Sequence, residues 1–268
     1  MSMAGWTNCR TEFIDVCGTK IELRSTGAGR PILFLHPGHG LIGAGAMLEK
    51  LATSGRILAP SHPGFGGSEL PASITTADDL AYFYLDLIET LDLRDVALIG
   101  ASFGGWLAAE IATKASDRIA RLVLIDSVGV KFGDRDTRDI ADLHAVQDDE
   151  LWALQLDDPK KNRPDYAALS DDDLVILARN NETLALLAWR PYMYNPKLRG
   201  RLRRIRIPTL VLWGAGDRVV PPGYGRALCR EIPGARFETV ERAGHLSFVE
   251  QPQACAARVE AFLGSIKP

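Results

Sequence analysis

The chain has 268 residues, of which 46% are hydrophobic and 24% are charged, and its formal net charge is −3. These are ordinary values for a globular protein, and a chain of this length buries about 70–75% of its unfolded surface. The near-balance of charge gives no electrostatic support for a nucleic-acid or anionic-membrane partner. No apolar run reaches the roughly 18–20 residues of a membrane span, and residues 1–10 lack a signal-peptide pattern. We therefore expect a protein with neither nucleic-acid nor membrane partners.

The four cysteines lie far apart and form no C-x-x-C pair; they are Cys9, Cys17, Cys229 and Cys255. Such spacing is typical of free thiols in a reducing compartment. The sequence therefore predicts a cytoplasmic location.

The first half of the chain alternates strand and helix patterns, which favours an α/β fold with a mostly parallel, doubly wound sheet. Apolar runs such as 31–35 are typical of strands buried on both faces. The first predicted elements are strands at 11–17, 19–25 and 31–35, a helix near 46–54 and a strand at 56–59. A turn cluster follows at 60–68, in which His62 is expected to brace the loop. Thr76 and Asp79 then resemble a capping box at the start of a helix, and strands are predicted at 96–99 and 121–125.

Residues 100–104 read Gly-Ala-Ser-Phe-Gly and fit the G-x-S-x-G nucleophile elbow. A buried strand precedes them, and Gly104, Ala108 and Ala112 follow at helical spacing. A ridge of small residues lets a helix lie close to a sheet, so the pattern predicts strand, tight turn and helix. Ser102 on this turn is the candidate nucleophile, held on strained backbone that its glycine neighbours tolerate.

The loop after residues 31–35 reads His36-Pro37-Gly38-His39-Gly40. Attack by a serine places negative charge on a substrate oxygen, and a backbone N–H aimed at that oxygen stabilises it. In this loop Gly38 is the candidate donor, because Pro37 has no N–H. His36 is expected to brace the loop, whereas His39 either contacts substrate or is a solvated loop residue. No further ligand stands at a suitable spacing, so no metal site is predicted.

Residues 130–200 break the alternation. Two acidic runs, at 148–150 and 171–173, stand where helix N-termini favour negative charge. Helical patterns around 140–155, 171–189 and 195–203 predict a helical cap over the site. The expected organisation is therefore a first core part at 1–129, the cap at 130–200, and a second core part at 201–268.

The cap also carries large apolar side chains that either line an acyl pocket or pack the cap against the core. We favour packing and assign no site residue among them; they are Trp152, Trp189, Tyr192 and Met193.

The last part of the chain supplies two further candidates. A buried strand at 208–213 leads through a Gly-x-Gly turn to Asp217, and His245 follows a late strand at 235–240. In this pattern His245 is the base that activates Ser102, and Asp217 fixes its tautomer. Asp126, which follows the strand at 121–125, is the alternative acid.

These motifs together resemble the α/β-hydrolase fold family over nearly the whole chain. The resemblance implies Ser102 as nucleophile, His245 as base, Asp217 as acid, and an oxyanion hole from the N–H groups of Gly38 and Phe103. Pro37 departs from the glycine that the family often has there. The motifs are Leu35-His-Pro-Gly38, Pro63-Gly-Phe-Gly-Gly-Ser68, Gly100-Ala-Ser-Phe-Gly-Gly105, Trp213-Gly-Ala-Gly-Asp217 and Ala243-Gly-His245.

Within the family the chain is similar to carboxylesterases and to carbon–carbon bond hydrolases of ring-cleavage products. The latter often carry tryptophan after the catalytic histidine, where this chain has Leu246, so we expect an enzyme that cleaves a small carboxylic ester. The dienoate hydrolases are the first alternative, and a non-hydrolytic lyase or ligand-binding protein is the second. Neither a cofactor nor a metal is expected, the partner is a small-molecule substrate, and the sequence leaves a homodimer open.

Overall fold

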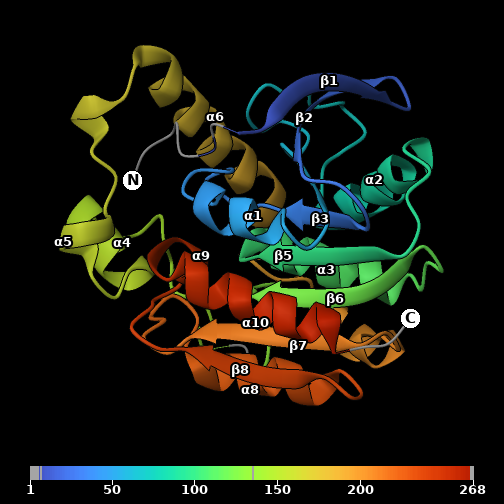
Figure 1. Cartoon of the computed structure of the whole chain (residues 1–268). Coiled ribbons are helices and arrows are strands. Elements are labelled where there is room, and N and C mark those ends of the chain that lie inside the picture. The colour runs from blue at the N-terminus through green and yellow to red at the C-terminus, as the bar shows by residue number, and fades with distance from the viewer. Residues whose placement is uncertain (1–5, 7, 135, 266–268) are drawn as a thin grey trace.

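The computed structural model describes residue 6, residues 8–134 and residues 136–265. These residues form one eight-stranded sheet with the order β1-β2-β4-β3-β5-β6-β7-β8 (Figure 1). β2 pairs antiparallel with β1 and β4, and all other neighbours are parallel. The strands are β1 (Arg10–Val16), β2 (Thr19–Thr26), β3 (Pro31–Leu35), β4 (Arg56–Pro60), β5 (Val96–Ala101), β6 (Ile119–Ile125), β7 (Thr209–Gly214) and β8 (Arg236–Val240).

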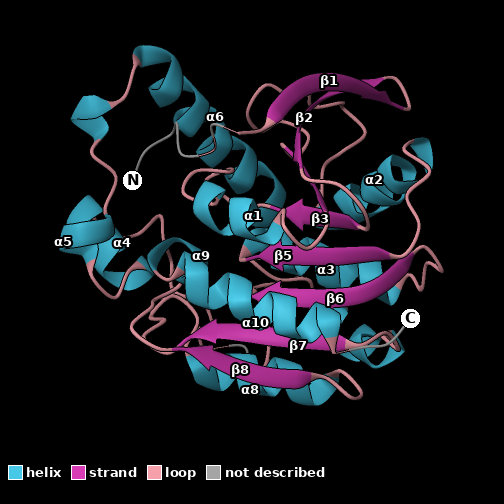
Figure 2. Ribbon diagram, in the orientation of Figure 1, coloured by secondary structure: helices cyan, strands magenta, loops and turns pink. Residues whose placement is uncertain are grey.

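Helices cover both faces of this sheet, which confirms the predicted α/β architecture (Figure 2). The strands alternate between two separate apolar clusters. In β3, Ile32 and Phe34 join the cluster that contains α1 and α10, and Leu33 and Leu35 join the cluster that contains α2, α3 and α8. These helices are α1 (Gly45–Leu51), α2 (Ala77–Thr90), α3 (Phe103–Thr113), α8 (Pro222–Glu231), α9 (Ser247–Glu250) and α10 (Pro252–Gly264).

A long stretch between β6 and β7, residues 126–208, carries the remaining helices and is called the β6–β7 segment below. Its two acidic runs open α4 and α6, as predicted from the preference of helix N-termini for negative charge. The helices are α4 (Asp148–Gln155), α5 (Pro159–Asn162), the 3₁₀ turn η1 (Tyr166–Ala168), α6 (Asp171–Ala188), α7 (Leu198–Arg201) and the 3₁₀ turn η2 (Leu202–Arg204).

The helix predicted around 140–155 was wrong over its first half, because α4 begins only at Asp148. The backbone before it bonds to distant groups instead of to itself. Ala141 donates its N–H to the carbonyl of Val219, and Leu143 donates to the hydroxyl of Tyr192. These long-range bonds hold residues 140–147 in an irregular path. The predicted helix around 195–203 is likewise divided into α7 and η2.

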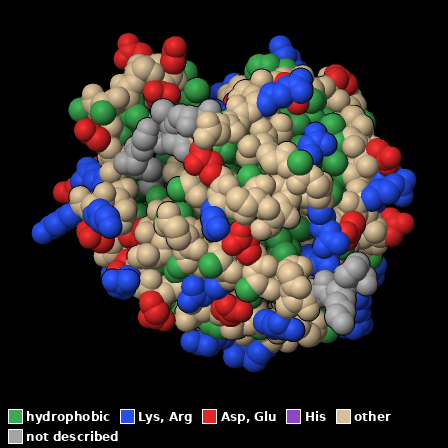
Figure 3. All heavy atoms as spheres, in the orientation of Figure 1, with side chains coloured by type: hydrophobic (Ala, Val, Ile, Leu, Met, Phe, Trp, Pro, Cys, Tyr) green, Lys and Arg blue, Asp and Glu red, His purple; other side chains and the backbone are tan. Residues whose placement is uncertain are grey.

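The predicted capping box at the start of α2 is confirmed: the Thr76 side chain accepts from the N–H of Asp79, and the Asp79 carboxylate accepts from the N–H of Thr76. Positive and negative side chains are interspersed over the face shown in Figure 3. Within the described ranges, no helix is long and apolar enough to cross a membrane. The four cysteines carry free thiols.

Candidate active site

Ser102 stands on a strained turn between β5 and α3, with φ 50° and ψ −113°. The turn is possible because the residues two positions before and after Ser102 are glycines. A Cβ on Gly100 would lie 2.1 Å from the carbonyl oxygen of Gly104, and a Cβ on Gly104 would lie 2.1 Å from that of Leu35. Both glycines are therefore required, and the predicted strand–turn–helix context is confirmed.

The structure brings Ser102, His245 and Asp217 together from three separate loops. His245 Nε2 lies 2.8 Å from the Ser102 hydroxyl oxygen, and its Nδ1 lies 2.9 Å from Asp217 Oδ2. The other Asp217 oxygen accepts the N–H groups of Val219 and Val220, each at 2.9 Å. With Nδ1–H donating to Asp217, Nε2 carries a lone pair and can take the serine proton.

Asp126 lies at the same sheet edge but turns to other partners. Its Oδ1 accepts the N–H of Gly214 at 2.7 Å, and its Oδ2 accepts the N–H and hydroxyl of Ser247 at 3.2 and 2.6 Å. No hydrogen bond joins Asp126 to His245 in the described part of the chain. The geometry of an acid partner for the imidazole is therefore met by Asp217.

Burial and two neighbouring carboxyl groups act on the pKa of the His245 imidazole. Burial by itself lowers the pKa of His245, but the charge and hydrogen bond of Asp217, and then the charge of Asp126, raise that pKa above its ordinary value. Burial and the charge of Asp217 in turn raise the pKa of Asp126 to about 8. The site therefore favours the imidazolium that forms when His245 accepts a proton.

The backbone N–H groups of Gly38 and Phe103 have no acceptor among the described residues. Gly38 follows β3, and Phe103 is the first residue of α3, whose N–H is free as in any first helical turn. A Cβ on Gly38 would lie 2.3 Å from the side chain of Leu184, so a larger residue here would displace that side chain. Gly38 and Ser102 line the same cavity and Phe103 follows Ser102, so both N–H groups are candidates for an oxyanion hole.

A buried pair of imidazoles holds the loop that carries Gly38. The rings of His36 and His62 stack with centroids 3.6 Å apart. The N–H of His62 donates to His36 Nε2, and His62 Nε2 donates to the His36 carbonyl, both at 2.9 Å. Tyr84 contacts the remaining His62 nitrogen. Burial lowers both pKa values, that of His62 to about 3, so the pair is neutral and acts as the predicted brace.

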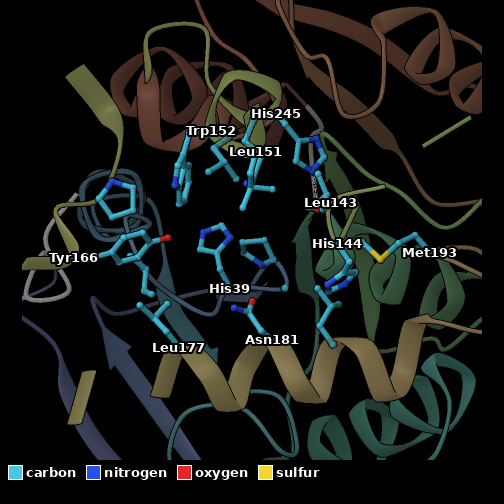
Figure 4. A pocket seen from close by; sticks show the side chains of 18 of the residues that line it. His39, Leu143, His144, Leu151, Trp152, Tyr166, Leu177, Asn181, Met193 and His245 are labelled. Atoms are coloured by element: carbon cyan, nitrogen blue, oxygen red, sulfur yellow. Dashed lines mark hydrogen bonds between the residues drawn. The ribbon is translucent and has the colours of Figure 1, made fainter. Parts of the chain in front are cut away.

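A cavity of about 190 Å³ is lined in part by Ser102 and His245, and Figure 4 shows His245 at its wall. Its wall is mainly apolar, and the lining residues that the structure describes include neither lysine nor arginine. The β6–β7 segment supplies much of this wall. Those of its residues that line the cavity are Leu143, His144, Leu151, Trp152, Gln155, Pro164, Tyr166, Leu169, Leu177, Asn181, Leu184 and Met193.

Four large side chains of the β6–β7 segment had been expected to pack rather than to line a pocket. Trp152 and Met193 do line the cavity, whereas Trp189 and Tyr192 lie elsewhere. Trp152 and Met193 are also buried in the two apolar clusters, so these two side chains both pack, as predicted, and line the cavity. Only the path of the β6–β7 segment decides which of its large side chains reach the cavity.

The β6–β7 segment is bonded directly to the loops that carry Asp217 and His245. The Glu250 carboxylate accepts the N–H groups of Gly244, Asp157 and Asp158 at 2.6, 2.9 and 2.9 Å. Arg218, next to Asp217, donates to two carbonyls near the end of α4, each at 2.7 Å. This contact set, called the Glu250 clamp below, fixes the end of α4 against both loops.

Within residues 6, 8–134 and 136–265, no three His, Cys, Asp or Glu side chains gather closely enough to hold a metal ion. The site itself offers a serine next to an imidazole, a carboxylate behind the imidazole, and two free N–H donors.

Known proteins resemble this chain over most of its length. A model of the alpha/beta hydrolase family matches residues 32–258. The 2-hydroxy-6-oxo-2,4-heptadienoate hydrolase of Pseudomonas putida F1 is 28% identical, with 92% of this chain and 94% of that protein covered.

Two solved structures illustrate the range of relatives. A thermophilic esterase from Thermogutta terrifontis superposes with a TM-score of 0.74 at 26% identity, over 96% of this chain and 98% of that one. A serine hydrolase involved in carbazole degradation shares the fold, with a TM-score of 0.78 at 20% identity, over 96% and 100%. The chain thus belongs to the alpha/beta hydrolase family and is a hydrolase.

Proposed function

We propose that the protein is a serine hydrolase that cleaves a small, uncharged carboxylic ester through an acyl-enzyme on Ser102. The observation that carries the proposal is the continuous hydrogen-bonded series from the Ser102 hydroxyl through His245 to Asp217, at the base of an apolar cavity. In this proposal the β6–β7 segment is the cap, and the N–H groups of Gly38 and Phe103 form the oxyanion hole.

The reaction proceeds in two halves. Ser102 Oγ attacks the ester carbonyl while its proton passes to His245 Nε2, and the oxyanion rests on the two N–H groups. The C–O bond then breaks, and His245 returns the proton to the departing alcohol. Water attacks the acyl-enzyme with His245 again taking the proton, and collapse of the second oxyanion releases the acid and restores Ser102. Each oxyanion donor contributes about 10²–10³ in kcat.

The absence of lysine and arginine from the described cavity wall favours an uncharged ester, because a carboxylate in an apolar cavity needs one cationic donor or several neutral donors.

The alternative is cleavage of a carbon–carbon bond in a dienoate. It is supported by the curated relatives, which include a 2-hydroxy-6-oxo-2,4-heptadienoate hydrolase.

The test is hydrolysis of p-nitrophenyl esters of increasing acyl length by the wild type, Ser102→Ala and Ser127→Ala. Ser127 is a matched control, since it is a buried serine at the same sheet edge whose hydroxyl donates only to the Val128 carbonyl. We expect turnover that Ser102→Ala abolishes and Ser127→Ala retains, with an acyl adduct on Ser102 visible by mass spectrometry. Turnover of a ring-cleavage dienoate, with none of any ester, would favour the alternative.

A further inference from the structure

His39 is a polar side chain inside the cavity that the proposed reaction does not use. It comes from the loop after β3, one residue beyond Gly38, and its ring projects into the cavity between Tyr166 and His144 (Figure 4). From the sequence alone, His39 has two interpretations: a substrate contact or a solvated loop residue. Its place in the wall beside Ser102 and His245 favours the first of these.

The backbone that carries His39 is fixed from the opposite side. The Asn180 side chain donates to the His39 carbonyl at 3.2 Å and accepts the N–H of Gly66 at 2.9 Å. A Cβ on Gly40 would lie 2.7 Å from the same Asn180 amide nitrogen. Asn180 itself is buried in α6. The His39 ring is therefore held by a preorganised loop, as a recognition group must be.

One ring nitrogen of His39 has a hydrogen-bond partner among the described residues and the other has none. The ring hydrogen-bonds to the Ile42 carbonyl, and Nε2 is buried without a partner in the described part of the chain. Buried polar atoms nearly always have hydrogen-bond partners, so Nε2 is free to take one from a bound molecule. Because Nε2 is unpartnered, the bond to Ile42 is assigned to Nδ1–H, and in that tautomer Nε2 carries a lone pair and accepts.

The ring is also neutral at ordinary pH. Burial, and then the neighbouring His245, lower the pKa of His39 to about 4. A neutral ring whose one proton is already engaged offers no hydrogen to an ester carbonyl or a carboxylate. It discriminates in favour of a ligand group that can donate.

We propose that His39 is a specificity-determining residue, and that its Nε2 accepts a hydrogen bond from a hydroxyl on the substrate, so that the preferred substrates are hydroxylated small esters. The inference rests on the proposed esterase function and narrows its substrate class. It follows from the geometry of the ring, its fixed loop and its unpartnered nitrogen.

The experiment compares kcat/KM for matched esters that differ in one hydroxyl. For the acyl side the pair is methyl 3-hydroxybutyrate and methyl butyrate. For the alcohol side it is 2-hydroxyethyl butyrate and propyl butyrate. We expect the hydroxylated member of one pair to be preferred about 10- to 100-fold, the size expected when a buried acceptor is left unpaired by the other member. Methyl 3-methoxybutyrate accepts but cannot donate, and it should gain no such preference.

The variants separate recognition from structure. His39→Leu removes the acceptor and should bring the preference close to one, whereas His39→Gln keeps an acceptor and should restore part of it. His144→Phe is the matched control, because His144 is a second histidine in the cavity wall whose ring is exposed, and it should retain the preference. A structural role for His39 would lower kcat/KM on both members of a pair equally.

The outcomes are distinct for the two proposals. Turnover of both members of each pair at similar rates, or a preference that His39→Leu retains, overturns the role of His39 and leaves the esterase proposal standing. Preference for the methoxy ester overturns the assignment of Nε2 as an acceptor. A folded wild type that turns over no member of either pair overturns the esterase proposal, and the inference falls with it.

Discussion

Two buried aspartates, Asp126 after β6 and Asp217 after β7, end neighbouring strands and lie near the same histidine. They differ in what their oxygens accept. Both oxygens of Asp126 are taken by groups of two loops, at Gly214 and Ser247. One oxygen of Asp217 is taken by its own turn, and the other faces His245.

Residue type and position at a strand end thus do not by themselves decide which carboxylate bonds to the imidazole. A carboxylate whose acceptor sites are filled by loop N–H groups ties those loops together. A carboxylate with one oxygen left over can orient a histidine. In the proposed mechanism Asp217 is therefore the acid, and Asp126 positions the loops that carry Asp217 and His245.

The largest effect is expected for Asp217→Asn. An amide in this place holds His245 in the wrong tautomer, and the corresponding change in a serine protease triad lowers kcat about 10⁴-fold. We expect a loss of that order on p-nitrophenyl acetate with little change in thermal stability. A loss below about tenfold would assign the acid role to Asp126 instead.

Asp126→Asn should lower kcat less, by about tenfold, because it loosens the contact with Ser247 on the loop that carries His245. The pH profile gives an independent readout. Activity needs neutral His245, whose raised pKa places the acid limb of kcat/KM above pH 6.5 in the wild type. Because the pKa of Asp126 is about 8, its carboxyl is mostly protonated along this limb, and Asp126→Asn should leave the limb nearly unmoved. A limb that moves to lower pH would mean that Asp126 is ionised there and acts on His245 through its charge.

Stability should also depend on Asp126 in a pH-dependent way. Its folded-state pKa of about 8 lies above the ordinary value of 3.8, so the native state binds this proton more tightly than the unfolded chain does. The contribution to stability is present below about pH 4 and is lost as the pH rises towards 8. Urea unfolding should therefore show wild type losing stability relative to Asp126→Asn between pH 5 and pH 8. Parallel pH curves for the two proteins would contradict the raised pKa.

The smallest effect is expected for Ser247→Ala. It removes one hydroxyl from Asp126 Oδ2 and leaves the backbone donors of Gly214 and Ser247 in place. The free energy of unfolding should fall by about 1–2 kcal/mol, with kcat within about threefold of wild type. Ser265→Ala, which removes a hydroxyl bond at the far end of α10, is the control. A loss of kcat as large as that of Asp126→Asn would place Ser247 in the chemistry itself.

Much of the core could be predicted from the sequence because its determinants are local. Gly100 and Gly104 are required by contacts within one turn and the strand beside it, so residues 100–104 alone predict the nucleophile elbow. The sequence also predicts that Ser102, Asp217 and His245 lie close together. Each follows a predicted strand, and the carboxyl ends of parallel strands meet at one edge of a sheet.

The rest could not be predicted because its determinants are long-range. The irregular path of residues 140–147 depends on Val219 and Tyr192, and the contribution of Trp152 to the cavity depends on how α4 is anchored. The unpartnered nitrogen of His39 is likewise invisible without its surroundings. The division into core and cap at residues 130 and 200 stays a prediction, and so do the catalytic roles.

The Glu250 clamp has a consequence for protein engineering. Exchanging the β6–β7 segment with that of a relative is an obvious route to new specificity, but the backbone N–H groups at 157 and 158 share one carboxylate with Gly244, the residue before His245. A Cβ on Gly244 would lie 2.7 Å from the Gln155 carbonyl, so the graft must also keep the close approach of α4 at this point. A chimera joined after residue 158 retains the Glu250 clamp. A chimera joined before α4 needs a donor segment that forms the same contacts.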